Sequence, residues 1–388
     1  MELRRIAEDD LSQVFGLISQ AFMRGGKDDG WIRDPATQAM HAYVVFEGAT
    51  LKAQAAIAPY QCHMGGDLVM KMGGIAGVAC HPTARGKGYA GMCMRRALEG
   101  MRDEGQTIST LFPFSWAYYR RLGWAWVGEK RRYGVPTSAM QSCPETRDVR
   151  PADEADHAAV RDLYTRFSAG YRGLIARDEA QWKQMLDHAE KEFTYTYLYP
   201  AAGPLEGYLT YRGGSRDNTH LREFICQTPA AKRALLGLLR RHDMQVSRFE
   251  WDAPADDDLR CHLCHWDVET RTTPCTQGRI VDVAGALRAW GASRGTEAAF
   301  VVRVADASAP WNEMTWAVTA GSGEATVAPS ASEPGLEIEI GELSQCLYGA
   351  PTVCQLRRAG LITVHDEAQF EAMERFFAGP TMWTNDSF

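Results

Sequence analysis

The spacing of hydrophobic and polar positions changes along the first third of the chain, which predicts alternating strands and helices. Apolar residues from Leu11 to Phe22 recur at the spacing of one helical face. We expect Asp10 to open this helix, with Gln13 reaching back as in a capping box. Strand-like runs occupy residues 3–6, 41–46, 51–59 and 68–72. A mixed α and β domain is therefore expected here.

The rest of the chain divides into two further regions. A helix capped near Asp153, strand-like runs at 193–199 and 205–211 and a helix at 228–242 repeat the order of the first third. Beyond Ile280, strand-like runs come first and helices at 341–348 and 366–378 come last, which favours an α+β domain. We expect domains at 1–134, 135–279 and 280–388. The tail from Pro380 is aromatic and nearly uncharged, which favours a docked segment.

Composition excludes several classes of protein. Hydrophobic residues make up 45% and charged residues 23%, and 42 basic against 49 acidic side chains give a net charge of −7. No basic block is present, so we expect no nucleic acid or anionic membrane as partner. No window approaches the ~18 apolar residues of a membrane span. The N-terminus carries acids early and lacks an apolar signal region, so we expect a cytoplasmic protein.

Ten cysteines are scattered along the chain, and one group merits comparison with metal sites. Residues 261–265 read Cys-His-Leu-Cys-His, and Cys275 follows. Taken literally, this is a haem-attachment spacing or a set of zinc ligands. Haem attachment requires export, and no second tight ligand pair completes a zinc site. We expect no metal.

The most informative stretch runs from Gly74 to Gly91. Small and apolar residues through Cys80 predict a buried strand, which His81 and Pro82 end. A glycine-rich turn follows at residues 85–88, and a helix follows from Tyr89. Strand, glycine turn and helix in this order present backbone N–H groups at a helix N-terminus, where a phosphate is favoured. A turn that merely joins strand to helix is the alternative interpretation, and neither the triphosphate P-loop nor the dinucleotide fingerprint is present.

This stretch resembles a known family. Arg85 to Ala90 matches the Arg/Gln-x-x-Gly-x-Gly/Ala pyrophosphate loop of the GNAT N-acetyltransferase superfamily, and residues 111–124 resemble the strand, short helix and Tyr-x-Arg-Leu-Gly-Trp ending of that fold. Length and a second GNAT-like region without the loop make the chain similar to Eis-type acetyltransferases. The resemblance implies an α+β (α/β) fold: tandem GNAT folds with mixed central sheets, followed by a sterol-carrier-protein-like α+β domain. It covers the whole chain and is strongest over residues 72–124.

The resemblance also implies roles for individual residues. The backbone of three residues would face the pantetheine arm and thioester: Val78, Ala79 and Cys80. Seven residues would cradle the pyrophosphate: Arg85, Gly86, Lys87, Gly88, Tyr89, Ala90 and Gly91. Phe114 and Ser115 would line the far side of the cofactor. Tyr119 matches the general acid, and Phe388 matches the residue whose terminal carboxylate is the general base.

These roles differ in chemical plausibility. Tyrosine, with a reference pKa of about 10, is a suitable donor to a thiolate, and Tyr118 is the alternative acid if the register slips by one. An α-carboxylate has a reference pKa of about 3.3–3.7, so it must be desolvated, act through water or mainly orient the cation. Asp28, Asp29 and Trp31 lie where this fold often builds an acceptor pocket.

The predicted function is acetyl-CoA-dependent N-acetylation of a primary amine on a small molecule, by direct transfer in a ternary complex. Aminoglycosides, polyamines and biosynthetic amines are candidate acceptors. The second domain is expected to lack a cofactor site, because residues 227–232 read Gln-Thr-Pro-Ala-Ala-Lys where a glycine loop would stand. By resemblance the assembly is a homo-oligomer, a hexamer. Two alternatives stay open: a hydrophobic-ligand carrier with an inactive GNAT region, and an N-acyltransferase that uses longer acyl-CoA donors.

Overall fold

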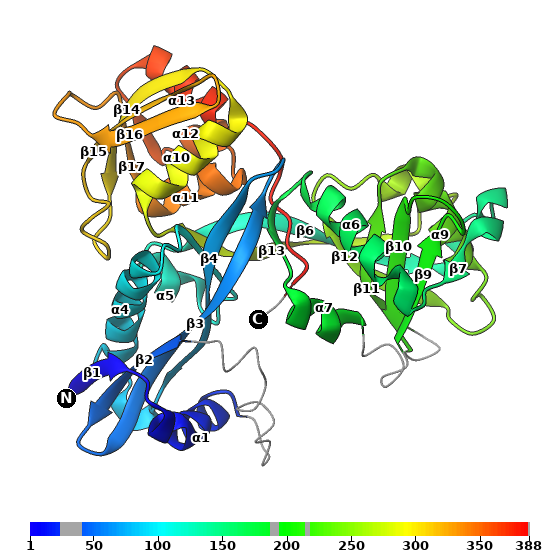
Figure 1. Ribbon diagram of the computed structural model, residues 1–388, viewed down its shortest axis with the longest axis horizontal. Helices are drawn as coiled ribbons and strands as arrows, with labels where there is room; N and C mark the ends of the chain where they lie inside the picture. The colour runs from blue at the N-terminus through cyan, green and yellow to red at the C-terminus, as the bar shows by residue number, and fades with distance from the viewer. Residues whose placement is uncertain (24–40, 187–193, 214–217, 387–388) are drawn as a thin grey trace. The chain divides into compact units, whose positions relative to one another are not determined.

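The computed structural model describes residues 1–23, 41–186, 194–213 and 218–386. The chain forms two compact units (Figure 1). The first contains Met1–Val127 and Thr276–Gly379, and the second contains Gly128–Cys275 and Pro380–Asn385. The first unit therefore contains both the N-terminal domain and the C-terminal domain.

The N-terminal domain is a sheet covered by helices. Its elements are β1 (Glu2–Arg5), α1 (Leu11–Ala21), β2 (His41–Glu47), β3 (Thr50–Met64), β4 (Val69–Cys80), α4 (Tyr89–Asp103), β5 (Ile108–Leu111), α5 (Trp116–Arg120) and the start of β6 (Ala125–Pro136), with short 3-10 turns at Glu8–Asp10 and Pro82–Ala84. The strand order is β1-β2-β3-β4-β5-β13, where β13 (Glu269–Ile280) returns from late in the sequence. Only the β4–β5 pair is parallel among the pairings described in this domain.

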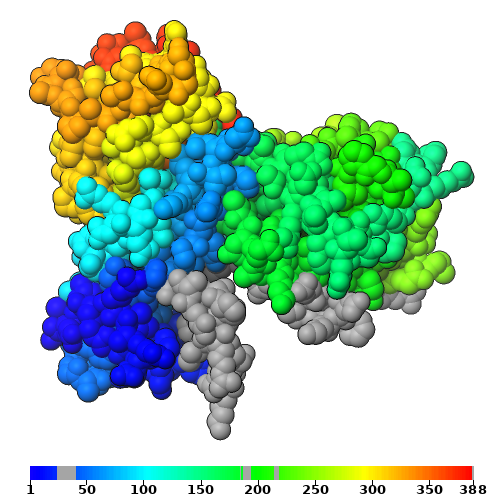
Figure 2. All heavy atoms as spheres, in the orientation of Figure 1, coloured from blue at the N-terminus to red at the C-terminus, as the bar shows by residue number. Residues whose placement is uncertain are grey.

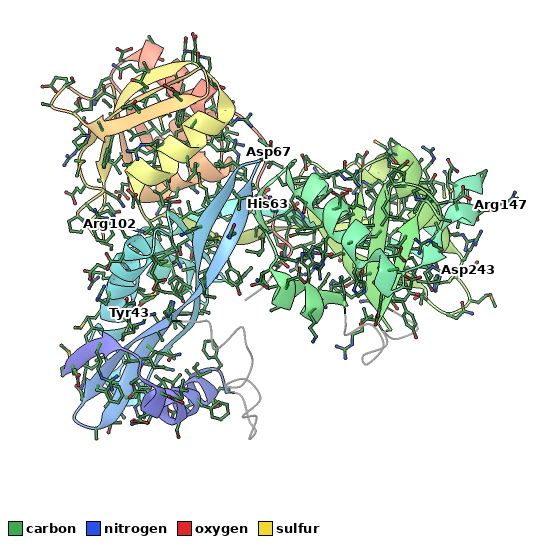
Figure 3. The ribbon with its side chains drawn as sticks, in the orientation of Figure 1. Tyr43, His63, Asp67, Arg102, Arg147 and Asp243 are labelled. Atoms are coloured by element: carbon green, nitrogen blue, oxygen red, sulfur yellow. The ribbon has the colours of Figure 1, made fainter. Side chains whose placement is uncertain are left out.

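Alternation along the strands sends side chains to two helical layers. On β2, Tyr43 and Val45 join the core beneath α4, while Val44 and Phe46 join the core beneath α1. Figure 3 labels Tyr43, whose hydroxyl lies so close to α4 that a Cβ added at Gly100 would be 2.3 Å from it. This close approach fixes α4, and with it the glycine turn at its start, against the sheet.

The predicted capping box at the first helix is wrong. Asp10 accepts from Arg4 Nη1 at 2.6 Å, Arg4 Nη2 at 2.8 Å and the Ala7 amide at 2.7 Å. Gln13 instead accepts from the Leu51 amide at 3.0 Å, so it ties α1 to β3. A bidentate arginine competes successfully for the carboxylate because charge-assisted hydrogen bonds are the stronger ones.

The C-terminal domain packs helices on a second sheet. Its elements are α10 (Val283–Arg294), β14 (Ala298–Ala305), β15 (Thr315–Gly321), β16 (Glu324–Pro329), β17 (Leu336–Glu339), α11 (Ile340–Tyr348), α12 (Val353–Arg358), β18 (Ile362–Val364) and α13 (Glu367–Phe377). The strand order is β16-β15-β14-β17-β18. The expectation of strands before helices is wrong at one point, because α10 precedes β14. Two glycines weaken its local helix signal.

The interior of the C-terminal domain is filled by large side chains. Trp290, Phe300 and Phe376 are 0%, 3% and 1% exposed. Trp290 donates its indole N–H to the Phe376 carbonyl at 2.7 Å, and Phe300 and Phe376 meet edge to face at 5.4 Å. A Cβ added at Gly291 would lie 2.8 Å from the Phe376 ring. No room for even a methyl group remains at this contact.

The second unit repeats the N-terminal arrangement. Its elements are the remainder of β6, then β7 (Arg150–Pro151), α6 (His157–Ser168), β8 (Arg172–Ile175), α7 (Glu179–Leu186), β9 (Thr194–Tyr199), β10 (Gly207–Arg212), β11 (Thr219–Cys226), α9 (Pro229–Arg240), β12 (Arg248–Pro254) and the start of β13, with 3-10 turns at Thr137–Ala139, Pro144–Asp148, Glu154–Asp156 and Leu259–His262. The strand order is β6-β12-β11-β10-β9-β7.

The same ion pair opens both repeats. In the second unit, Arg150 donates twice to Asp156 at 2.6 Å, and the Asp153 amide donates to that carboxylate at 2.9 Å. This reproduces the Arg4 and Asp10 arrangement, including the six-residue spacing between partners. The same ion pair at equivalent positions supports the interpretation, drawn from the order of elements, that the second unit repeats the N-terminal domain.

The tail Pro380–Asn385 is docked on the second unit, which confirms that expectation for these residues. The Arg172 amide donates to the Thr381 carbonyl at 3.0 Å, and the Trp383 amide donates back to Arg172 at 2.8 Å. Met382 is fully buried against Gly128 and Gly173, where an added Cβ would lie 2.8 Å and 2.6 Å from the methionine side chain. These two glycines create the slot that holds the tail.

Candidate active site

Strands β4 and β5 separate at the predicted cofactor segment. Their parallel pairing runs from Met72 with Ile108 to Ile75 with Leu111 and ends there. From Ala76 to Cys80, β4 remains paired with β3 on its other edge but has no partner among the described strands on the β5 side. The backbone of Val78, Ala79 and Cys80 therefore borders an open edge, where an extended ligand can add hydrogen bonds as a further half-strand.

A β-bulge distorts β4 at the same place. The β3–β4 register shifts between Gln54 and Ala56, and Gly77 has φ +56°. Gln54 is 1% exposed and donates to the Gly77 carbonyl at 2.9 Å. An extra residue in one strand turns its backbone groups away from the regular ladder. The bulge thus redirects the start of the open edge at Val78.

The glycine turn presents free amides at the start of α4. Among the described residues, the N–H groups of Gly86, Gly88, Tyr89, Ala90 and Gly91 donate to no acceptor, and the first satisfied amide of the helix is Met92, bonded to Gly88 at 3.0 Å. No acidic residue lies in the first turn. Free donors and the positive end of the helix dipole favour an anion at this point.

Two glycines shape this turn. Gly86 and Gly88 have φ +81° and +83°, which L side chains rarely adopt, and a Cβ added at either position would meet nothing within 4 Å. The surroundings are open, so the turn has room for a bulky anion such as a diphosphate. The residues present therefore fit the diphosphate of coenzyme A.

The charged groups of the turn have different partners. Lys87 Nζ donates to Glu47 Oε1 at 3.0 Å, and the Tyr89 hydroxyl also donates to Glu47. These two donors lower the pKa of the Glu47 carboxyl, the Tyr89 hydrogen bond most. In the described part of the chain, Arg85 has no ion pair and is exposed. Sequence patterns do not identify Glu47 as part of the site, because it lies 40 residues from Lys87 and its position at the end of β2 carries no motif.

Three aromatic rings gather beside the open edge. Phe114, Tyr118 and Tyr119 have ring centroids 5.0–5.4 Å apart. Phe114 is 66% exposed, whereas Tyr119 is 3% exposed. Ser115 caps α5, because its hydroxyl oxygen accepts from the Tyr118 amide at 3.4 Å. The predicted lining residues and the predicted acid are therefore neighbours, with Ser115 setting the start of the helix that carries the tyrosines.

The two tyrosines stay protonated over the physiological range. Burial raises the pKa of Tyr118 to about 12, with Cys93 and Cys80 adding to the effect. Burial also raises the pKa of Tyr119, and Tyr118 adds to it. Among the described residues, the buried Tyr118 hydroxyl has no hydrogen-bond partner. Both hydroxyls therefore carry a proton at neutral pH, and the unpaired hydroxyl of Tyr118 can still donate a hydrogen bond.

The cysteines near the site are poor nucleophiles. Burial raises the pKa of Cys93 to about 12, and burial also raises the pKa of the Cys80 thiol. Because the thiolate is the reactive form, neither side chain is activated for covalent catalysis.

In the second unit, the N-terminus of α9, which corresponds to that of α4, has one N–H group of its first turn occupied and another removed. Thr228 caps α9 by accepting from the Ala231 amide at 3.1 Å, and Pro229 removes another N–H from the first turn. Lys232 is 8% exposed and bonds Asp257 at 2.7 Å, with Asp258 as its second partner. The bound carboxylates and the occupied donors of this helix start disfavour a diphosphate.

Several predicted positions fall outside the described residues: Asp28, Asp29, Trp31 and Phe388. In the part of the chain that the structure describes, no group of three or more His, Cys, Asp or Glu side chains could hold a metal ion. Cys261 and Cys264 are exposed, whereas Cys275 is buried in β13. Among the described helices, none is both long and apolar enough to cross a membrane.

Most of the chain matches known protein families. Residues 2–127 and 173–280 each match an acetyltransferase (GNAT) domain family, and residues 283–385 match the sterol carrier protein domain family. An uncharacterized N-acetyltransferase of Streptomyces avermitilis is 24% identical, covering 100% of this chain and 99% of the relative.

Solved structures share the fold along the whole chain. A GCN5-related N-acetyltransferase from Anabaena variabilis superposes with a TM-score of 0.88 at 21% identity, covering 100% of both chains. Eis1 from Mycobacterium abscessus superposes with a TM-score of 0.81 at 20% identity, again covering 100% of both. The chain is therefore a GNAT acetyltransferase with two GNAT domains and a C-terminal sterol carrier protein domain.

Proposed function

We propose that this N-acetyltransferase uses acetyl-CoA to acetylate a primary amine of a small molecule by direct transfer in a ternary complex. The supporting observation is the set of five free amides at residues 86–91, beside a strand edge that opens from Ala76 onward. Bound acetyl-CoA supplies an activated thioester. The second unit has no comparable set of donors at α9, so one donor site per chain is proposed.

The proposed reaction needs three contributions from the chain. A C–N bond forms and a C–S bond breaks at the acyl carbon, so the amine must be neutral and the departing thiolate must gain a proton. The turn at 85–91 binds and orients the donor, and a main-chain N–H near Val78 stabilises the developing oxyanion. Tyr119 donates the proton, since a tyrosine hydroxyl is protonated at neutral pH and can donate to a thiolate within hydrogen-bond reach. Tyr118 is the alternative donor.

The acceptor amine loses its proton to a base, for which we propose the terminal carboxylate of Phe388. A carboxylate with a reference pKa of about 3.3–3.7 is weak against an ammonium. Desolvation, a bridging water or a mainly orienting role are the three ways in which it can serve. Cys80 and Cys93 have no part in the proposal, because burial raises the pKa of both thiols.

An amine-panel assay tests the proposal. Purified protein with acetyl-CoA and a panel of aminoglycosides, polyamines and amino compounds is monitored for free thiol and for products by mass spectrometry. Amine-dependent thiol release with an acetylated product supports the proposal. Thiol release without an acetylated product, or no release above the hydrolysis rate with any amine, would contradict it.

Two alternatives are separated by simple controls. A lipid carrier requires an open apolar interior, whereas Trp290, Phe300 and Phe376 fill the C-terminal domain at the contact with Gly291. An N-acyltransferase of longer chains would prefer octanoyl-CoA or palmitoyl-CoA over acetyl-CoA. Competing these donors at equal concentration on one acceptor identifies the preferred acyl group.

We also propose a homohexamer, which light scattering coupled to gel filtration tests.

A further inference from the structure

The short helix that carries Tyr119 depends on its surroundings. Helix α5 spans only Trp116–Arg120, and isolated helices of this length are unstable in water. Ser115 supplies a single capping bond at its start. After it, the chain turns at Leu122 and Gly123 and returns into β6. The position of the Tyr119 side chain is therefore set by whatever holds this turn.

Two residues of β13 hold both ends of the turn. Gln277 Nε2 donates to the Trp116 carbonyl at 3.3 Å and to the Trp124 carbonyl at 3.1 Å. Arg279 Nη1 donates to the Leu122 carbonyl. Gly123 has φ +88°, and a Cβ there would lie 1.6 Å from Arg279 Nη1. The guanidinium thus occupies the space that any larger residue at 123 would need.

The C-terminal domain fixes Arg279 in turn. Arg279 Nη2 bonds Asp306 Oδ1 at 2.8 Å and Oδ2 at 2.6 Å, and the side chains are 0% and 1% exposed. Asp306 also accepts from the Ser308 and Ala309 amides and from Asn312 Nδ2, each at 3.1 Å. With this many partners the carboxylate has one orientation, and it transmits that orientation to the guanidinium.

Helix α11 of the C-terminal domain also contacts α5 and the start of β6. Arg120, adjacent to Tyr119, pairs with the buried Glu342, and Gln345 Nε2 donates to the Trp126 carbonyl at 2.7 Å. The space-filling view shows the cyan atoms of the α4 and α5 region adjoining the yellow and orange atoms of the C-terminal domain (Figure 2). Arg102 of α4, labelled in Figure 3, stacks on Trp311 of that domain at 4.9 Å.

We propose that Arg279 is a positioning residue for Tyr119, anchored by Asp306, and that the C-terminal domain supports the acid of the reaction through this pair. The inference rests on the proposed role of Tyr119 as proton donor. Arg279 contacts no reacting atom. It holds the Leu122 carbonyl, and Leu122 and Trp124 in turn donate their amides to the Tyr119 carbonyl at 2.9 and 3.1 Å.

Arg279→Lys in the full-length chain is the central test. Lysine keeps the charge beside Asp306, but a single ammonium lacks the planar fork that reaches both Asp306 and Leu122. We expect kcat to fall by about 10- to 100-fold, because small misplacements of a catalytic group have effects of this size. The Kd of coenzyme A should stay within about twofold. Hydrogen exchange of peptide 116–124 should become faster. Arg4→Lys, which perturbs the bidentate pair with Asp10 in the same unit, is the control and should leave kcat unchanged.

A double-mutant cycle with Tyr119→Phe separates positioning from general destabilisation. If Arg279 acts through Tyr119, then Arg279→Lys should change kcat by less than about twofold in the Tyr119→Phe background. Equal losses in both backgrounds, or unchanged exchange of peptide 116–124, would overturn the positioning role and leave Tyr119 as the acid. An unchanged kcat for Tyr119→Phe alone would overturn both. Asp306→Asn, which keeps the side-chain size, replaces Arg279→Lys if that variant does not fold.

Discussion

Gly88→Ala adds one methyl group to the glycine turn at residues 85–91, which presents free amides at the start of α4. Gly88 has φ +83°, and a Cβ there would meet nothing within 4 Å, so the added methyl is free of clashes and the backbone conformation is the sole source of strain. Holding an L residue in this left-handed conformation costs about 1–2 kcal/mol. In an exposed turn with open surroundings, we expect the mutant backbone to relax to a different conformation in the free protein.

Binding must then restore the left-handed conformation, so the strain appears in the affinity for coenzyme A. A cost of about 1–2 kcal/mol weakens binding about 5- to 30-fold, since about 1.4 kcal/mol is a factor of ten. Isothermal titration of the full-length protein with coenzyme A at fixed salt measures this change. The free energy of unfolding without ligand should fall by less than about 1 kcal/mol.

Gly105→Ala is the matched control for this experiment. Gly105 follows α4 at the opposite end, with φ +72° and equally open space around an added Cβ. It carries the same conformational penalty but presents no amide to the diphosphate. Its Kd for coenzyme A should stay within about twofold of wild type. A Gly88→Ala protein that binds coenzyme A as tightly as Gly105→Ala does would refute the role of Gly88 in aiming the amides.

Four further predictions follow from particular contacts. Tyr119→Phe should lower kcat by about 100-fold or more with an unchanged Kd for coenzyme A, while Tyr118→Phe has the smaller effect; the reverse order would transfer the acid role to Tyr118. Glu47→Gln should tighten coenzyme A binding by about 2- to 5-fold at low salt, because a carboxylate that competes for Lys87 is removed; weaker binding would mean that Glu47 mainly positions Lys87. The Arg4 hydrogen bonds lower the pKa of Asp10 below 3.8, so its stabilisation is complete above the unfolded pKa and is lost as pH falls through the folded one; urea unfolding of wild type and Asp10→Asn should differ by a constant amount from pH 8 to 5 and converge below about pH 4. Adding residues after Phe388 should lower kcat for amine acetylation, and a fully active extended protein would remove the terminal carboxylate from the mechanism.

Local signals were sufficient to predict the strand, glycine turn and helix of residues 74–91. A strand ended by His81 and Pro82, a glycine turn at 85–88 and a helix from Tyr89 are properties of neighbouring residues. In the structure β4 ends at Cys80 and α4 begins at Tyr89, as expected. The helix cap predicted near Asp153 is local in the same sense. The aromatic cluster around Tyr119 was also accessible, because its members lie within six positions of each other.

Contacts between residues far apart in the sequence could not be predicted from local patterns. Arg279 meets Leu122 across 157 positions, and Lys87 meets Glu47 across 40, so no periodicity or motif reports either contact. The capping box at Asp10 failed because Arg4, six residues earlier, takes the carboxylate. Helix α10 was missed because Gly285 and Gly291 weaken its local propensity, and Gly291 is explained only by the Phe376 ring packed against it. In each case tertiary contacts override the local pattern.

A crystal structure with bound coenzyme A tests most directly whether the turn at 85–91 holds the donor. If the turn holds the donor, diphosphate oxygens lie within about 3 Å of the amide nitrogens of Gly88 to Gly91, and the pantetheine arm lies alongside Val78 to Cys80. A coenzyme bound at another place on the chain, with those amides directed at protein groups, would contradict it.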